Sequence, residues 1–158
     1  MKTLLANRTL SSTRDNEHHM EFVAEKNGVT YVNDSASIDI KRTVKSIDEI
    51  DAELVLIIGG QDEKTDYTMF LNISLDKIKS LIYTGRTPER IFRLFGKQDC
   101  FFVTALSLQE AVQIATTLGQ PGQVVLFSPA CPSYDAFDNY KNRGNLFKQL
   151  IAGLSNIQ

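Results

Sequence analysis

Hydrophobic residues follow two different periodicities along this chain. Residues 1–17 are mostly polar and follow neither, and we interpret them as a flexible N-terminal arm. From Met20 to Ala24 apolar residues occupy every second position, which is typical of a half-buried β-strand. Asn27-Gly28 is a tight-turn signal, and residues 29–32 resume the strand pattern. The pattern therefore predicts a β-hairpin at the start of the folded chain.

Beyond the hairpin, helix-like and strand-like patterns alternate. Helices are predicted near residues 40–47, 67–75, 87–95, 107–118 and 145–154, and buried strands at residues 54–58, 81–83, 100–103 and 124–127. The strands are continuous apolar runs, as in sheets covered on both faces. Four alternations with short connections predict an α/β fold. We expect a Rossmann-like, doubly wound, mainly parallel sheet with helices on both faces and the N-terminal β-hairpin at its edge.

Loops that follow the predicted strands are the places where a ligand is expected. In open parallel sheets, ligands usually bind beyond the carboxyl ends of the strands. Gly59–Asp62, Thr84-Gly85 and Ser128–Cys131 follow three predicted strands, and Asn33–Ser35 follows the hairpin. We expect these loops to meet at one rim of the sheet.

Composition and charge agree with one globular domain over residues 18–158. The chain is 42% hydrophobic, and 17 basic against 19 acidic residues give a formal net charge of -2, which argues against a nucleic-acid partner. The first residues lack the apolar run of a signal peptide or a membrane span. We expect a cytoplasmic protein without membrane insertion. Cys100 and Cys131 form no CxxC pair and are interpreted as reduced thiols.

Several kinds of catalytic site are missing from the sequence. It contains no GxxxxGK[ST] phosphate loop, no GxGxxG fingerprint and no Gly-x-Ser-x-Gly elbow. His18 and His19 are neighbours in an extended segment, so they point to opposite faces and cannot chelate one metal ion together. We therefore predict no metal site and assign no catalytic residue.

One segment, residues 128–144, combines hydroxyl, aromatic and charged side chains. It leaves a buried strand through Pro129 and ends at Gly144, which we interpret as opening a helix. Such groups near exposed backbone amides suit a small polar or anionic ligand. From the pattern alone a structural loop is the more frequent outcome, and a ligand-binding loop is the alternative.

The same segment closely resembles the motif Ser-Pro-Ala-Cys-Ala-Ser-Phe-Asp-x-Phe-x-Asn-Tyr-x-x-Arg-Gly of the Mur ligase family. Further family motifs follow the same order. His18–Glu21 is similar to His-Arg-(Met/Leu)-Glu, Asn33–Asp39 to Asn-Asp-Ser-Lys-Ala-Thr-Asn, and Gly59–Tyr67 to Gly-Gly-x-Asp-Lys-Gly-x-Asp-Phe. The resemblance covers about residues 18–152 and is strongest to the D-glutamate-adding ligases of peptidoglycan biosynthesis.

The resemblance implies the C-terminal domain of these three-domain enzymes, a lid that holds D-glutamate and presents charged groups to ATP. By position it implies substrate-binding and nucleotide-facing residues. The former are Ser133, Tyr134, Tyr140, Ser35 and Lys64, and the latter are His19 and Asp34. ATP and Mg²⁺ belong to the full-length family, whose ATPase and UDP-sugar domains the resemblance does not cover. We therefore expect no cofactor for the isolated chain.

Several family positions carry altered side chains. Ala36 stands where the motif has lysine, Ile38 where it has threonine, Glu63 where it has the lysine that pairs with the D-glutamate carboxylate, and His19 where it has arginine. Lys64, one place after Glu63, would compensate only in part. Each lost charge-assisted hydrogen bond removes roughly 1.5–3 kcal/mol.

We therefore predict a stand-alone, degenerate lid domain, a pseudoenzyme that binds a cell-wall enzyme or a small polar ligand other than D-glutamate. Two alternatives remain. The chain supplies its lid in trans to a protein with the other two domains, or it is a fragment of a longer ligase. Met1 and an N-terminal arm unlike the family's interdomain linker favour the stand-alone interpretation.

Overall fold

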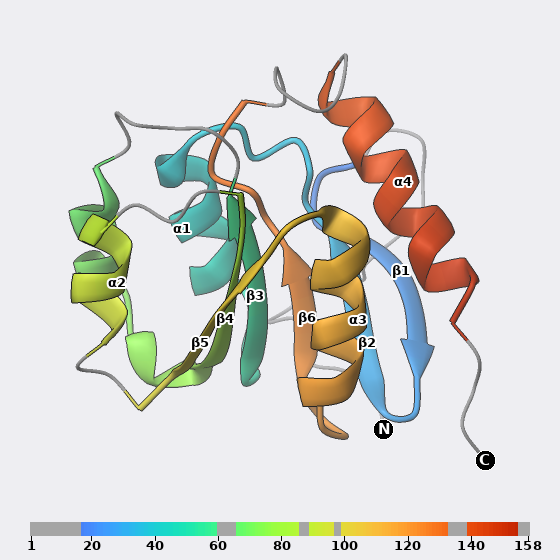
Figure 1. The fold of residues 1–158 in the computed structure, drawn as a ribbon, viewed down its shortest axis with the longest axis horizontal. Coiled ribbons are helices and arrows are strands. Elements are labelled where there is room, and N and C mark those ends of the chain that lie inside the picture. The colour runs from blue at the N-terminus through green and yellow to red at the C-terminus, as the bar shows by residue number, and fades with distance from the viewer. Residues whose placement is uncertain (1–16, 60–65, 86–88, 97–98, 133–138, 155–158) are drawn as a thin grey trace.

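The computed structural model describes residues 17–59, 66–85, 89–96, 99–132 and 139–154. Its centre is a six-stranded sheet in the order β1-β2-β6-β3-β4-β5 (Figure 1). β1 and β2 are antiparallel, and every other neighbouring pair is parallel. The strands are β1 (Glu21–Lys26), β2 (Val29–Asn33), β3 (Leu54–Gly59), β4 (Ile78–Thr84), β5 (Phe101–Ala105) and β6 (Val124–Phe127).

Helices cover both faces of this sheet. They are α1 (Ile40–Asp48), α2 (Glu89–Phe95), α3 (Leu108–Leu118) and α4 (Tyr140–Ala152), with two 3-10 helices, η2 (Tyr67–Asn72) and η3 (Leu75–Lys77). One core lies under α1, η2 and α2, and the other lies under α3 and α4 (Figure 1). In β3, Leu56 and Ile58 join the first core and Val55 and Ile57 join the second. Both faces of β3 are buried, which explains its continuous apolar sequence.

The structure confirms the predicted fold class. The sheet is mainly parallel and carries helices on both faces, and the N-terminal hairpin forms its edge. The arm predicted at residues 1–17 lies outside the described residues except for Glu17. None of the helices in the described part of the chain is long and apolar enough to span a bilayer.

Two predicted helices differ from the observed ones. Instead of one helix over 67–75, the chain forms η2 and η3, separated by the extended residue Ile73. Tyr67 and Phe70 are both buried, and their spacing of three residues matches one turn of a 3-10 helix. The last helix begins at Tyr140 and not at residue 145, because the side chain of Asn139 caps it by accepting from the Asn142 N–H.

Gly144 was predicted to open the last helix and instead lies within its second turn. A Cβ atom at this position would overlap Nδ1 of His18 and lie 2.8 Å from its Cε1 atom. Glycine is therefore present because the ring of His18 packs against the helix backbone. A tertiary contact of this kind leaves no local signal in the sequence.

Candidate functional site

The carboxyl ends of β2, β6 and β3 meet at one rim of the sheet, as the sequence predicts. The Asp34 N–H donates to the carbonyl of Phe127 at 2.8 Å, and the Gly59 N–H donates to the carbonyl of Pro129 at 2.9 Å. The loops after these three strands are thus hydrogen-bonded to one another. We call this region the rim.

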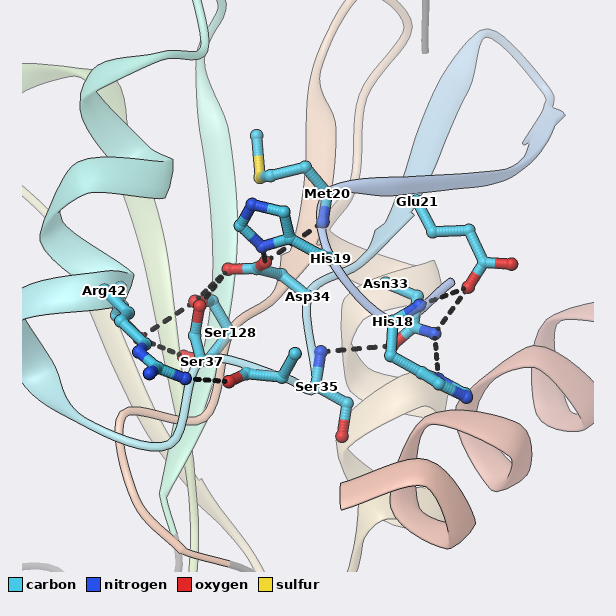
Figure 2. A network of polar contacts seen from close by, with 12 residues as sticks. His18, His19, Met20, Glu21, Asn33, Asp34, Ser35, Ser37, Arg42 and Ser128 are labelled. Carbon is cyan, nitrogen blue, oxygen red and sulfur yellow. Dashed lines mark hydrogen bonds and ion pairs between the residues drawn. The ribbon is translucent and has the colours of Figure 1, made fainter. Parts of the chain in front are cut away.

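Asp34 is the centre of a buried polar cluster at the rim (Figure 2). One carboxylate oxygen accepts from the Met20 N–H at 3.0 Å. The other accepts from the hydroxyls of Ser37 at 2.6 Å and Ser128 at 2.7 Å. The hydroxyl of Thr43, on α1, lies 2.9 Å from that of Ser128. We call Asp34, Ser37, Thr43 and Ser128 the Asp34 cluster, and it joins β2, β6 and α1.

His19 lies on the solvent side of this cluster. Its Nδ1 atom is 3.5 Å from the nearer carboxylate oxygen of Asp34, and its side chain is 57% exposed whereas that of Asp34 is fully buried. The two residues that the resemblance assigns to the nucleotide are therefore neighbours. The described contacts of Asp34 hold the protein together, and only His19 presents its ring outward. The nucleotide-facing role of both stays a prediction.

A second set of buried polar residues joins the end of β2 to β1. The Asn33 side-chain amide lies 3.0 Å from Nδ1 of His18 and donates to Glu21 at 2.9 Å (Figure 2). Glu21 also accepts from the His18 N–H at 3.0 Å. The ring of His18 meets that of Tyr140 edge to face at a centroid distance of 6.0 Å. Burial lowers the pKa of His18 below its ordinary value, and the positive charge of Lys148 adds to this effect.

Arg143 connects α4 to the same rim. Its guanidinium donates to the hydroxyl and carbonyl of Ser35 at 3.0 and 2.8 Å and to the carbonyl of Cys131 at 3.0 Å. The Ser35 hydroxyl in turn donates to the carbonyl of Tyr140 at 2.7 Å. Arg143 is only 4% exposed, and this burial lowers its pKa. We call His18, Asn33, Ser35 and Arg143, with Gly144, the α4 anchor.

The structure brings Ser35 and Tyr140 together among the predicted substrate-binding residues. The hydrogen bond between them holds the rim to α4, and Tyr140 is half-buried. Ser133, Tyr134 and Lys64 lie outside the described residues, as does Glu63. The substrate-binding role of all these residues stays a prediction.

Ala36 and Ile38 occupy the loop that the Asp34 cluster holds in place. The Ala36 N–H donates to the carbonyl of His18 at 2.9 Å, and the Ala36 carbonyl accepts from Arg42 at 3.3 Å. Both Ala36 and Ile38 are half-buried at the rim. The loop backbone is therefore fixed where the related motif has a lysine and a threonine, and here it presents a methyl and an isoleucine side chain.

Sequence reasoning missed the side-chain contacts that build the rim. The sequence identified Arg143 only as one residue of the family motif. The three oxygen atoms that accept from it belong to Ser35 and Cys131, which lie in loops that follow different strands. Ser128 lies 85 residues from Thr43 and 94 from Asp34, and no spacing of these residues and Ser37 signals a cluster. Within the described residues, no group of three or more His, Cys, Asp or Glu side chains is arranged to hold a metal ion.

The sequence of this chain is similar to those of one group of enzymes. No protein-family model matches the sequence. The chain is 36% identical over 138 residues to a UDP-N-acetylmuramoylalanine–D-glutamate ligase of Chloroherpeton thalassium, covering 87% of this chain and 29% of the relative. It is 40% identical over 137 residues to the ligase of the same name from Geotalea uraniireducens, covering 87% and 30%. The chain thus spans less than a third of the length of these curated relatives.

A solved structure shows the same fold. A murein peptide ligase from Psychrobacter arcticus superposes with a TM-score of 0.59 at 11% sequence identity, covering 89% of this chain and 31% of that one. At this level of identity the likeness concerns the fold alone.

Proposed function

This chain belongs to the Mur ligase family as a homologue of one of its domains, and from that premise we propose that it is a binding module that has kept the family's lid scaffold without ligating on its own. The order of its motifs matches the C-terminal lid. We propose that it works in the cytoplasm, and that its ligand is a small polar or anionic molecule recognised at the rim.

The observation that carries this proposal is a contrast at the rim between its framework, the buried hydrogen bonds of Asp34, and the side chains that the loop presents to a ligand. The buried Asp34 carboxylate accepts three hydrogen bonds, two of them short, and fixes the loop after β2. The loop so fixed carries Ala36 and Ile38, which offer neither a positive charge nor a hydroxyl to a ligand. A framework that is kept while cationic contacts are absent supports binding of something other than D-glutamate.

A second candidate function is the complete ligation reaction. The curated relatives are D-glutamate ligases, of which this chain covers 29–30%. On this alternative the chain acts as the lid of a ligase, either joined to the other two domains or supplied in trans. ATP, Mg²⁺ and the UDP-sugar would then be bound by those domains.

Titration of the isotopically labelled chain with D-glutamate, followed by NMR, tests the proposal. We expect no saturable chemical-shift change with the natural sequence. The triple variant Ala36→Lys, Ile38→Thr and Glu63→Lys restores the motif side chains. It should bind saturably, with an affinity roughly 10- to 100-fold above the upper limit that the natural chain sets, because charge-assisted hydrogen bonds are regained. Gln113→Lys, on the exposed side of α3, is the control for added charge.

Two results would contradict the proposal. Saturable binding of D-glutamate by the natural chain would mean that the site is intact. Restoration of ligation when the chain is added to a D-glutamate ligase that lacks its C-terminal domain would establish the alternative, a lid that works in trans.

A further inference from the structure

The two edge strands of the sheet differ in how their outer sides are protected. Three of the six residues of β1 are charged, and its register with β2 shifts between Phe22 and Ala24. The ammonium of Lys26 also binds the carbonyl of Leu154 at 2.8 Å, beyond the end of α4. Charges, irregular register and covering contacts are the features that keep a sheet edge from pairing with another chain.

Among the residues that the structure describes, β5, at the opposite edge, has none of these features. Its sequence, Phe-Phe-Val-Thr-Ala, contains neither a charged residue nor a proline. Its register with β4 is regular from Phe101 to Ala105. In the described part of the chain it pairs with β4 alone, so one row of backbone N–H and C=O groups faces outward.

Apolar side chains flank this outer row on both faces of the sheet. Phe92 of α2 is 55% exposed and meets Phe102 edge to face at 5.7 Å. Phe101 is 57% exposed and alternates with Phe102, so it lies on the opposite face, where Val103 packs into the core under α3. A strand added beside β5 would therefore meet a phenylalanine on each face.

We propose that the outer side of β5 is a self-association edge, where β5 of a second copy of this chain pairs antiparallel across a twofold axis. Charge selects this occupant. β5 is neutral, so pairing it with itself opposes no like charges, whereas a charged segment would find no counter-charge on β5. The formal net charge of only -2 also leaves little repulsion between copies.

The sequence of β5 is also complementary to itself in size. A twofold axis at Val103 would set Phe101 of each copy opposite the small Ala105 of the other. Antiparallel pairing of identical strands is the usual geometry of a closed twofold dimer. This inference does not depend on the proposed function. β5 is itself an edge strand, whereas the proposed ligand lies at the rim beyond β2 and β6.

Sedimentation of the pure chain over about a hundredfold range of concentration tests the proposal. We expect a reversible monomer–dimer equilibrium. Thr104→Lys places a like charge on the exposed side of β5 in both copies and should weaken the dimer roughly tenfold or more. Thr117→Lys is the matched control, since it makes the same change at an exposed position of α3 and should leave the equilibrium unchanged.

Amide hydrogen exchange of the natural chain provides a readout that does not depend on a variant folding. The outward N–H groups of β5 should exchange more slowly as concentration rises, while those of β1 should not change. A chain that stays monomeric with concentration-independent exchange in β5 would overturn the proposal. A dimer that Thr104→Lys and Thr117→Lys leave equally stable would overturn it too, because the contact would then lie elsewhere.

Discussion

The Asp34 cluster and the α4 anchor hold opposite sides of the same short loop by different means. The cluster surrounds one buried carboxylate with donors from Met20 before β1, Ser37 in the loop before α1 and Ser128 just after β6. The anchor uses a guanidinium and an imidazole, and its partners are mainly backbone carbonyls and neutral side chains. The cluster joins strands that already pair in the sheet, whereas the anchor fastens a helix from outside.

This difference teaches where the rim is rigid and where it is adjustable. Because Asp34 is fully buried and its acceptors are occupied by three donors, the loop after β2 has one well-defined position. The position of α4 depends instead on a close fit between His18 and Gly144. We expect the cluster to set the stability of the domain and the anchor to set the position of Tyr140.

Removing the central carboxylate should have the largest effect. Asp34→Ala leaves the Ser37 hydroxyl and the Met20 N–H without their acceptor, and the Ser128 hydroxyl with only that of Thr43. We expect a loss of roughly 3–5 kcal/mol in the free energy of unfolding. Denaturant unfolding measures this loss. Asp39→Ala is the matched control, because it removes an exposed helix cap that binds the Arg42 N–H and should cost about 1 kcal/mol. Equal losses would contradict the central role of Asp34.

Adding one methyl group should break the α4 anchor. Gly144→Ala would push a Cβ atom into the ring of His18, and such overpacking should lower the free energy of unfolding by roughly 1–3 kcal/mol despite the better helix propensity of alanine. Gly153→Ala, at the end of α4, is the control, since its new Cβ would lie 3.6 Å from the nearest atoms and should change stability little.

Thermal melts compare the two glycine variants, and NMR shifts of Tyr140 report whether the helix has moved. A stable Gly144→Ala protein with an unchanged Tyr140 environment would show that His18 does not fix the helix.

The sequence was sufficient to predict the sheet and its two helical layers, because alternation of apolar runs and amphipathic stretches is a local property. It also predicted that the ends of β2, β3 and β6 meet at the rim, since parallel strands end on the same side. It did not predict the start of α4 at Tyr140, because a glycine such as Gly144 usually disfavours a helix interior. Here glycine is required by the ring of His18, which packs against the helix at this position.

The hydrogen bonds inside the rim could not be predicted from the sequence either. Ser128 is 94 residues from Asp34, and Ser35 is 108 residues from Arg143. No periodicity links residues at such separations. Pairing between them follows from the strand order, which places β2 next to β6 although they are distant in the chain.

A smaller effect on stability is expected at Ser37, where this chain differs from the related motif. Ser37 stands where the motif has alanine, and its hydroxyl donates to Asp34 at 2.6 Å. Ser37→Ala should lower the free energy of unfolding by roughly 1–2 kcal/mol, since Asp34 keeps its other donors. Ser46→Ala, at a buried serine within α1, is the matched control and should be neutral or slightly stabilising because alanine favours helix. Equal effects would mean that the Ser37 hydroxyl adds nothing to the cluster.

The smallest effect should come from acidification, and it should act on the α4 anchor. Burial lowers the pKa of His18 in the folded state, so the unfolded chain takes up a proton more readily than the folded one. The stability associated with neutral His18 is thus present above the ordinary histidine pKa of about 6.5 and is lost as pH falls through and below it. The charges that face His18 are Glu17, Glu21, Lys141 and Lys148.

Denaturant unfolding between about pH 7.5 and 5.5 measures this loss in a range where carboxylates stay ionised. His18→Asn keeps a side chain that tolerates the positive φ of 66° at this position but cannot titrate, so its stability should fall less on acidification. His19→Asn removes the exposed neighbouring ring and should retain the steeper dependence caused by His18. If the His18 and His19 variants lost stability in parallel with the natural chain, the pH response would come from groups outside the α4 anchor.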